Sequence, residues 1–170
     1  IIGPNGAGKS TLFKVISGNL KQDKGDIYFH SLNINNLNIN KRARLGIAQS
    51  FQKNSLFLEM TVKESIMLAL SHKYKITFKM LNSLISNKAI NNDAIEIAKD
   101  TGLHDYFDTK SDNLSYGLQR QLELGIAISC SPKLLLLDEP TAGMSPAETK
   151  EIIKLIKNLS AKYSIIIVEH

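Results

Sequence analysis

Apolar residues recur with two different periods along the chain, and these periods predict its strands and helices. Residues 134–138 and 164–168 are short, almost continuous apolar runs of strand length. Between these runs, residues 146–160 carry apolar side chains every three or four positions, as an amphipathic helix does. Strands that alternate with helices predict an α/β fold whose mainly parallel sheet is covered on both faces.

Other segments carry similar helix or strand signals. Thr61 followed by Glu64 predicts a capped helix over 62–70, because these two side chains can bond to each other's backbone amides. The remaining predicted elements are the end of a strand at 1–2, a helix over 9–17, an edge β-hairpin over 25–34, a strand over 46–51 and a helix over 116–130.

Residues 71–112 lack strand signals and repeat their apolar residues at helical spacing. We expect this segment to form a helical subdomain inserted into an α/β core of residues 1–70 and 113–170. Residues 1–170 would then form one partial domain. We also expect the sequence to be cut at both ends, because it begins and ends on what look like interrupted strands.

Composition narrows the classes of function. The chain is 43% hydrophobic and 22% charged, as globular domains are, and no apolar run reaches the roughly 18 residues that cross a membrane. Its net charge of +5 is concentrated in residues 1–58, but the lysines are scattered and aromatic residues are only 6%, so no nucleic-acid partner is expected. The single cysteine, Cys130, lies in an apolar run, which predicts a buried thiol in a cytosolic protein.

The first motif with chemistry is a glycine-rich loop between a strand end and a helix start. It fits the P-loop pattern G-x-x-x-x-G-K-[ST], in which backbone amides surround phosphates, the lysine reaches the β- and γ-phosphates and the serine hydroxyl binds Mg²⁺. The alternative, a glycine-rich turn with a solvated lysine, does not explain the full match in this context. The predicted ATP-binding residues are Gly3, Pro4, Asn5, Gly6, Ala7, Gly8, Lys9, Ser10 and Thr11.

Two acids end the apolar strand over 134–138. A strand buried on both faces would bring Asp138 to the carboxyl edge of the sheet beside the P-loop, where it can hold Mg²⁺ directly or through water. Glu139 would point elsewhere and could polarise an attacking water. The alternative is that both carboxylates only solvate a strand end, but the P-loop upstream favours the catalytic interpretation.

A third motif separates the classes of P-loop protein. Residues 114–117, LSYG, precede the acidic strand and resemble the LSGGQ signature of the ABC ATPases. A P-loop kinase or GTPase would leave this motif unexplained. The other motifs of the family follow in order: a Q-loop at Phe51-Gln52, a D-loop at 140–146 and a switch histidine at His170.

This resemblance implies a P-loop NTPase fold and Mg²⁺-dependent hydrolysis of ATP. It also implies a head-to-tail homo- or heterodimer with a second ATPase subunit, because the signature binds the ATP of the opposite subunit. The implied catalytic residues are Glu139, His170 and Gln52. The implied metal-binding residues are Ser10, Gln52 and Asp138. The implied signature residues are Leu114, Ser115, Tyr116 and Gly117.

Two positions depart from the family pattern. Leu118 replaces the fifth signature residue, a glutamine, and removes a polar contact expected near the ribose. Ser145 stands where many members carry a D-loop aspartate. Neither change removes a contact to phosphate, metal or water, so we expect altered affinity or coupling and an active site that still works.

Within the family, LSYG and the run PTAGMSPAET are similar to the branched-chain amino-acid importer ATPases, with the urea-type importers close by. This similarity implies membrane permease partners, an indirect link to a solute-binding protein and a peripheral position on the cytoplasmic face of the plasma membrane. The alternative is a soluble ABC ATPase that acts on ribosomes or nucleic acid. DNA-acting members carry a long coiled coil before the signature, and no heptad run lies between Lys9 and Ser115.

Overall fold

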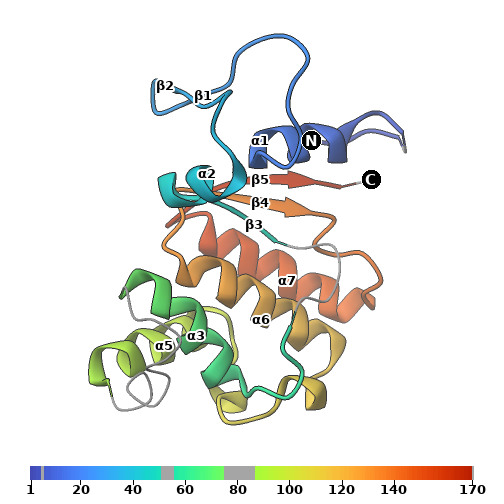
Figure 1. The fold of residues 1–170 in the computed structure, drawn as a ribbon. Helices are drawn as coiled ribbons and strands as arrows, with labels where there is room; N and C mark the ends of the chain where they lie inside the picture. Colours follow the sequence, from blue (N-terminus) through green and yellow to red (C-terminus); the bar gives the residue numbers. More distant parts are fainter. Residues whose placement is uncertain (5, 51–55, 75–86, 170) are drawn as a thin grey trace.

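The computed structural model describes residues 1–4, 6–50, 56–74 and 87–169. Strands β3 (Ile47–Gln49), β4 (Leu134–Asp138) and β5 (Ser164–Val168) form a parallel sheet in the order β3-β4-β5. Ile2 forms a parallel bridge with Glu169 and so lies beside the end of β5. The α/β fold with a parallel sheet is therefore confirmed (Figure 1).

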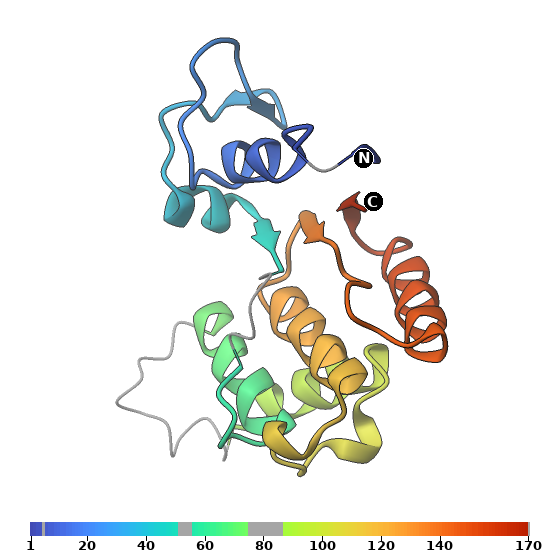
Figure 2. The ribbon, with the colours of Figure 1, turned by 90° about the vertical axis from the view of Figure 1, so that its right-hand side faces the viewer.

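The central strand β4 is buried on both faces. Leu136 packs with Phe13 of helix α1 (Lys9–Ser17) on one face. Leu135 and Leu137 pack on the other face against α6 (Tyr116–Ser129) and α7 (Pro146–Leu159). Figures 1 and 2 show the resulting layers, with α1 on one side of the sheet and α6 and α7 on the other.

A small hairpin and a short helix complete the layer that holds α1. Strands β1 (Tyr28–Phe29) and β2 (Leu32–Asn33) pair antiparallel, as the alternation in 25–34 predicted. Helix α2 (Ile39–Leu45) was missed by the sequence prediction. Its signals are short-range ones: Asn38 caps its first turn by accepting a hydrogen bond from the Lys41 amide, and Gly46 ends it in the left-handed conformation.

The helical part of the chain has a core of its own. Helix α3 (Val62–Lys73) packs on α5 (Lys88–Asp100) and on α6, and two short 3₁₀ turns, η2 (His104–Tyr106) and η3 (Ser111–Asn113), follow α5. The predicted capping box of Thr61 and Glu64 is present. This core includes Ile66 and Leu70 of α3 and Leu122 of α6, so its packing extends beyond the segment 71–112 on both sides.

The prediction that Cys130 is buried is wrong. Helix α6 ends at Ser129, and Cys130 is exposed at the point where the chain leaves the helix. The apolar run that suggested burial turns its other residues, such as Ala127 and Ile128, toward the core. In the described part of the chain, no helix is both long enough and apolar enough to cross a membrane.

A buried arginine joins α2 to the end of α1. Arg42 is 1% exposed, and its Nη1 donates hydrogen bonds to the carbonyls of Val15 (2.6 Å) and Ile16 (2.9 Å). Its Nε donates to the Leu37 carbonyl at 2.9 Å. The last carbonyls of a helix lack partners within the helix and carry partial negative charge, so a cation satisfies both requirements. Burial lowers the pKa of Arg42, and these carbonyls offset the cost of its desolvation.

Replacing Arg42 by methionine should therefore destabilise the protein. Arg42→Met keeps most of the apolar stem but leaves buried carbonyls without a donor, which should lower the free energy of unfolding by about 2–4 kcal/mol. Urea denaturation measures the loss. The matched control is Arg44→Met, an exposed position on the same helix, whose stability should stay within about 0.5 kcal/mol of the parent. Equal stability of the two variants would contradict the role given to Arg42.

Candidate functional site

The carboxyl edge of the sheet gathers segments from both ends of the chain. The Glu169 amide donates to the Ile1 carbonyl (3.2 Å), and the Glu139 amide donates to the Val168 carbonyl (2.9 Å). These bonds place the start of loop 3–8 and the residues after β4 and β5 at one edge. In parallel α/β sheets this edge is where ligands bind.

At two positions in loop 3–8 the backbone has a conformation that only glycine adopts readily. Gly6 and Gly8 have φ angles of 80° and 88°, and Gly8 is the N-cap of α1. No side chain caps this end of α1, where the first amides of a helix point toward a ligand. The loop and the first turn of α1 surround a depression of about 220 Å³, lined by Gly6, Ala7, Gly8, Lys9, Ser10, Thr11 and Glu139.

Lys9 places a positive charge at this depression. Its side chain is 8% exposed, and Nζ donates hydrogen bonds to the carbonyls of Gly3 and Pro4, the latter at 3.0 Å. The first turn of α1 holds no acidic residue. The ammonium group, the helix dipole and the amides of the first turn of α1 therefore all favour an anion at the same place, as phosphate binding requires.

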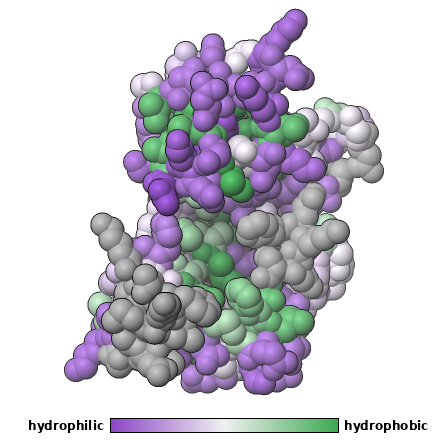
Figure 3. Space-filling model, in the orientation of Figure 1, coloured by the Kyte–Doolittle hydropathy of each residue, from purple (hydrophilic) through white to green (hydrophobic). Residues whose placement is uncertain are grey.

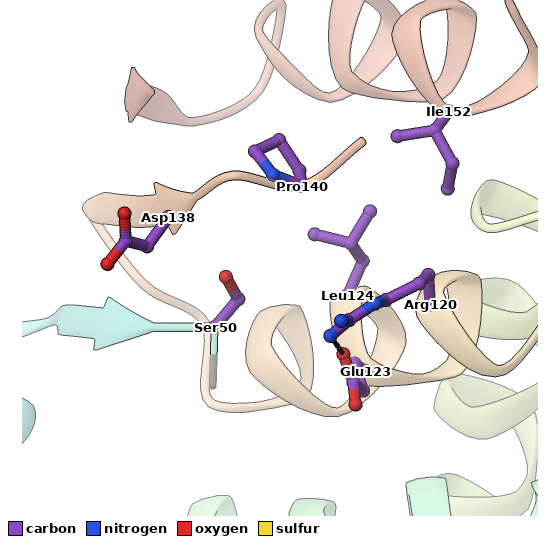
Figure 4. Close-up of a pocket in the computed structure, with 7 residues that line it drawn as sticks. All are labelled: Ser50, Arg120, Glu123, Leu124, Asp138, Pro140 and Ile152. Atoms are coloured by element: carbon purple, nitrogen blue, oxygen red, sulfur yellow. Dashed lines mark hydrogen bonds and ion pairs between the residues drawn. The ribbon is translucent and has the colours of Figure 1, made fainter. Parts of the chain in front are cut away.

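The two acids after the Leu run take different directions, as the sequence predicted. Asp138 is buried at the end of β4 and follows the alternation of Leu134 and Leu136, so it shares their face of the sheet, toward α1. Figure 4 shows it beside Ser50 of the neighbouring strand end. Glu139 has a φ of 48°, a left-handed conformation that is uncommon for a non-glycine residue. This turn of the backbone brings Glu139 to the depression that Lys9 and Ser10 line.

The signature segment lies away from this depression. Ser115 caps α6, and its Oγ accepts from the Leu118 amide. Tyr116 contacts the loop before α7, Gly117 contacts the first turn of α7, and none of residues 114–117 lines the depression at loop 3–8. The structure therefore brings residues 6–11 and Glu139 together at one depression, places Asp138 beside them at the end of β4, and separates 114–117 from the depression. Asn5, Gln52 and His170 lie outside the described residues.

Both departures from the family pattern have a structural role. Ser145 caps α7, and with Glu148 it forms a capping box in which the Glu148 carboxylate accepts from the Ser145 amide at 3.0 Å. Leu118 is half-buried against the helical core. Position 118 therefore contributes packing where the family has a polar group.

Sequence reasoning missed an ion pair inside α6. Arg120 Nη1 donates to Glu123 Oε2 at 2.6 Å, and their side chains are 14% and 6% exposed. Burial raises the pKa of Glu123, while the Arg120 charge opposes the shift. Together with Ser50 and Asp138 the pair lines a small cavity (Figure 4). In the sequence this ion pair is indicated only by the three-residue separation of Arg120 and Glu123, and oppositely charged residues at that separation are also common on solvated helix faces.

Comparisons with known proteins agree with this geometry. The model of the family described as "ABC transporter" matches residues 1–142. The branched-chain amino acid transport ATP-binding proteins LivG of Escherichia coli and BraF of Pseudomonas aeruginosa are 36% and 34% identical to this chain. Each alignment includes 100% of this chain and 69% of the relative. The lipopolysaccharide export system ATP-binding protein LptB of Acidithiobacillus ferridurans is 32% identical, with 100% of this chain and 67% of LptB covered.

Solved structures give the same result. MJ1267, an ATP-binding cassette of an ABC transporter, superimposes with a TM-score of 0.83 at 34% identity and covers 99% of this chain and 68% of its own. The ATP-binding cassette MJ0796, in a dimeric post-hydrolysis state bound to ADP and Pi, has a TM-score of 0.78 at 26% identity. That match covers 99% of this chain and 72% of MJ0796.

The charge of Lys9 is the feature of the loop most open to a direct test. In the full-length protein, Lys9→Ala should abolish tight binding of ATP, because it removes the ammonium group that faces the phosphates. Equilibrium titration with ATP measures the affinity. Lys14→Ala, at an exposed position on the same helix, should bind as the parent does. A Lys9→Ala variant with parental affinity would show that the phosphates lie elsewhere.

Proposed function

Because this chain belongs to the ABC transporter family, whose cassettes are ATPases, we propose that its hydrolysis of ATP drives the import of a branched-chain amino acid or similar solute. The observation that carries the proposal is the meeting of Lys9, Ser10, Asp138 and Glu139 at one edge of the sheet. The identity to LivG and BraF, both named for branched-chain amino acid transport, supports the solute class.

The chemistry is divided among these residues. Backbone amides of loop 3–8 and Lys9 would hold the β- and γ-phosphates. The Ser10 hydroxyl and the Asp138 carboxylate would supply hard oxygen donors, which suit Mg²⁺, an ion that needs few protein ligands beside phosphate oxygens. When bound, Mg²⁺ would neutralise charge that develops on the phosphates. Glu139 would polarise the attacking water, with Gln52 and His170 as the proposed further contacts.

A head-to-tail dimer would complete the site. Ser115 and Gly117 do not line the depression of their own chain, so in the proposed dimer they would contact the ATP held by the second ATPase subunit. The dimeric state of MJ0796 supports this arrangement. A homodimer would contain two identical sites, and a heterodimer would pair this chain with a related subunit.

The proposed permease site is a groove between α3 and α6. Its lining residues come from one face of each helix: Ser65, Leu68 and Ala69 of α3, and Glu123, Ile126 and Ala127 of α6. The groove has a volume of about 260 Å³ and opens beside Phe57, which is 61% exposed, and Leu58 is 48% exposed nearby. Figure 3 shows exposed apolar surface in this middle region of the molecule. An apolar groove with exposed large side chains at its mouth suits the apolar face of a helix.

A second depression, which is basic, lies where α3 ends and the chain leaves α6. It has a volume of about 630 Å³ and is lined by His72 and Cys130 together with Arg44 and Lys133. Its described lining contains no acidic residue. The proposed permease segment would therefore be amphipathic, with an acidic side chain near one end. Bound in this way, the subunit would lie on the cytoplasmic face of the membrane, while a solute-binding protein would meet the permease on the other face.

Transport itself tests the proposal. The full-length protein and its permease are reconstituted in vesicles, with ATP on the side of the membrane that holds this subunit. Radiolabelled leucine should then move from the opposite side to the ATP side, and only when the solute-binding protein is present on the opposite side. The LptB relative motivates the competing arrangement, an export system. Movement in the opposite direction, without need for a binding protein, would refute import and leave ATP hydrolysis standing.

The role of Glu139 can be separated from binding. Glu139→Gln keeps the size of the side chain but removes the base, so ATP should still bind while turnover falls by about 10²–10⁴-fold. ATP that is held without hydrolysis should trap the dimer, which size-exclusion chromatography detects. Glu151→Gln, on the exposed side of α7, is the matched control. If Glu139→Gln hydrolyses ATP at the normal rate, another residue must activate the attacking water.

The groove is tested by a charge at its mouth. Leu58→Glu should weaken co-purification with the permease and uncouple transport, because a carboxylate would be buried in an apolar contact. Basal ATP hydrolysis and melting temperature should survive, since Leu58 is exposed. Ile153→Glu, at an exposed apolar position of α7, is the control and should bind the permease normally. Undiminished permease binding by Leu58→Glu would exclude this surface from the docking site.

A further inference from the structure

The start of α6 is bonded to the loop that leads into α7. The Gly117 amide donates to Glu148 Oε1 at 3.1 Å, and the Tyr116 hydroxyl donates to the Ala142 carbonyl at 3.2 Å. The other carboxylate oxygen of Glu148 accepts from the Ser145 amide (3.0 Å) and the Ser145 hydroxyl (2.7 Å). One carboxylate therefore ties the signature segment to the D-loop segment of the same chain.

The two segments approach each other closely at two glycines. A Cβ atom on Gly117 would lie 3.0 Å from both Cγ and Oε1 of Glu148. Gly143, with a φ of 77°, lies under Tyr116, and a Cβ there would come 3.6 Å from the tyrosine hydroxyl oxygen. An ordinary capping box needs only the contacts between Ser145 and Glu148. The bond to Gly117 and the packing of Tyr116 go beyond that local requirement.

Tyr116 is itself held in place. Its hydroxyl oxygen accepts hydrogen bonds from Arg120 Nε (3.2 Å) and Nη2 (2.7 Å), while the hydroxyl proton goes to Ala142. Arg120 in turn is fixed by its ion pair with the buried Glu123. This chain of contacts continues from the D-loop segment into the cavity beside Asp138 (Figure 4).

We propose that Glu148 and Tyr116 form a clamp that holds residues 114–117 and 142–145 as one rigid block, and that both act as positioning residues for closure of the ATP-bound dimer. The proposal rests on the dimer put forward above, in which Ser115 and Gly117 contact the ATP held by the second subunit. Association has to order any interface loop that is mobile beforehand, and a preformed block lowers that cost. The clamp would thus favour dimer closure without touching the ATP bound by its own chain.

The test measures ATP-dependent dimer formation by the full-length protein in the Glu139→Gln background. Glu148→Ala removes the carboxylate that bonds both Gly117 and Ser145. Tyr116→Phe removes only the hydroxyl bonds and keeps both the ring and the capping box. Each should weaken the dimer about tenfold or more, because a hydrogen bond that fixes the interface is lost in both subunits of a homodimer. The affinity of Glu148→Ala for ATP, measured at protein concentrations too low for dimers, should equal that of the parent. Glu151→Ala, on the exposed side of α7, should behave as the parent.

A purely structural role would give a different pattern. In that case the variants would melt at lower temperatures, but their dimer constants, measured well below melting, would equal that of the parent, and the clamp would be refuted as a positioning device. If the Glu139→Gln parent itself stays monomeric with ATP, both the proposed dimer and the role of the clamp in its closure are refuted.

Hydrogen exchange tests whether the clamp holds the two segments together, whatever the oligomeric state. The Gly117 amide should exchange faster in Glu148→Ala than in Glu151→Ala, and equal exchange rates would refute the clamp.

Discussion

Burial of β4 on both faces is the constraint from which the rest of the molecule follows. Leu136 faces α1, and Leu135 and Leu137 face α6 and α7, so a single strand joins the two helical layers. Each buried leucine contributes about 1.5–3 kcal/mol relative to exposure. A shift of register by one residue would exchange the two faces. The same alternation sets the direction of Asp138, which therefore reaches the nucleotide edge as a consequence of packing.

Helix α1 is held by a cation at each end, and this explains how the P-loop keeps its shape. Lys9 bonds the loop carbonyls at the amino end, and Arg42 bonds the last carbonyls at the carboxyl end. Arg42 places its positive charge at the negative, carboxyl end of the helix dipole, which is favourable. Lys9 places its positive charge at the positive, amino end, which is unfavourable unless an anion binds there. A phosphate group at this end of α1 would complement both the Lys9 ammonium group and the helix dipole.

Much of the fold could be predicted from local patterns, whereas the contacts that position the site could not. The leucine run, the P-loop pattern and the Thr61 capping box are short-range signals, and the structure confirms the elements they predicted. The bonds of Arg42 to α1 and of Glu148 to Gly117 gave no such signal, because these partners lie 27 and 31 residues apart in sequence and meet only in the folded chain. The prediction that Cys130 is buried was wrong for a related reason: apolar neighbours in the sequence do not show where a helix ends.

The parallel pairing of Ile47 with Leu134 closes a long loop that contains all of α3, α5 and α6. The entropy cost of closing a flexible loop rises only with the logarithm of its length, by about 0.6 kcal/mol for each doubling. Because the helices inside this loop have their own core, a change in their length need not disturb the sheet register. Lengthening this loop would slow folding, because the strands that pair would be farther apart in sequence, but it would change the free energy of unfolding little. Insertions and deletions can therefore accumulate between β3 and β4 during evolution while the ATP edge stays the same.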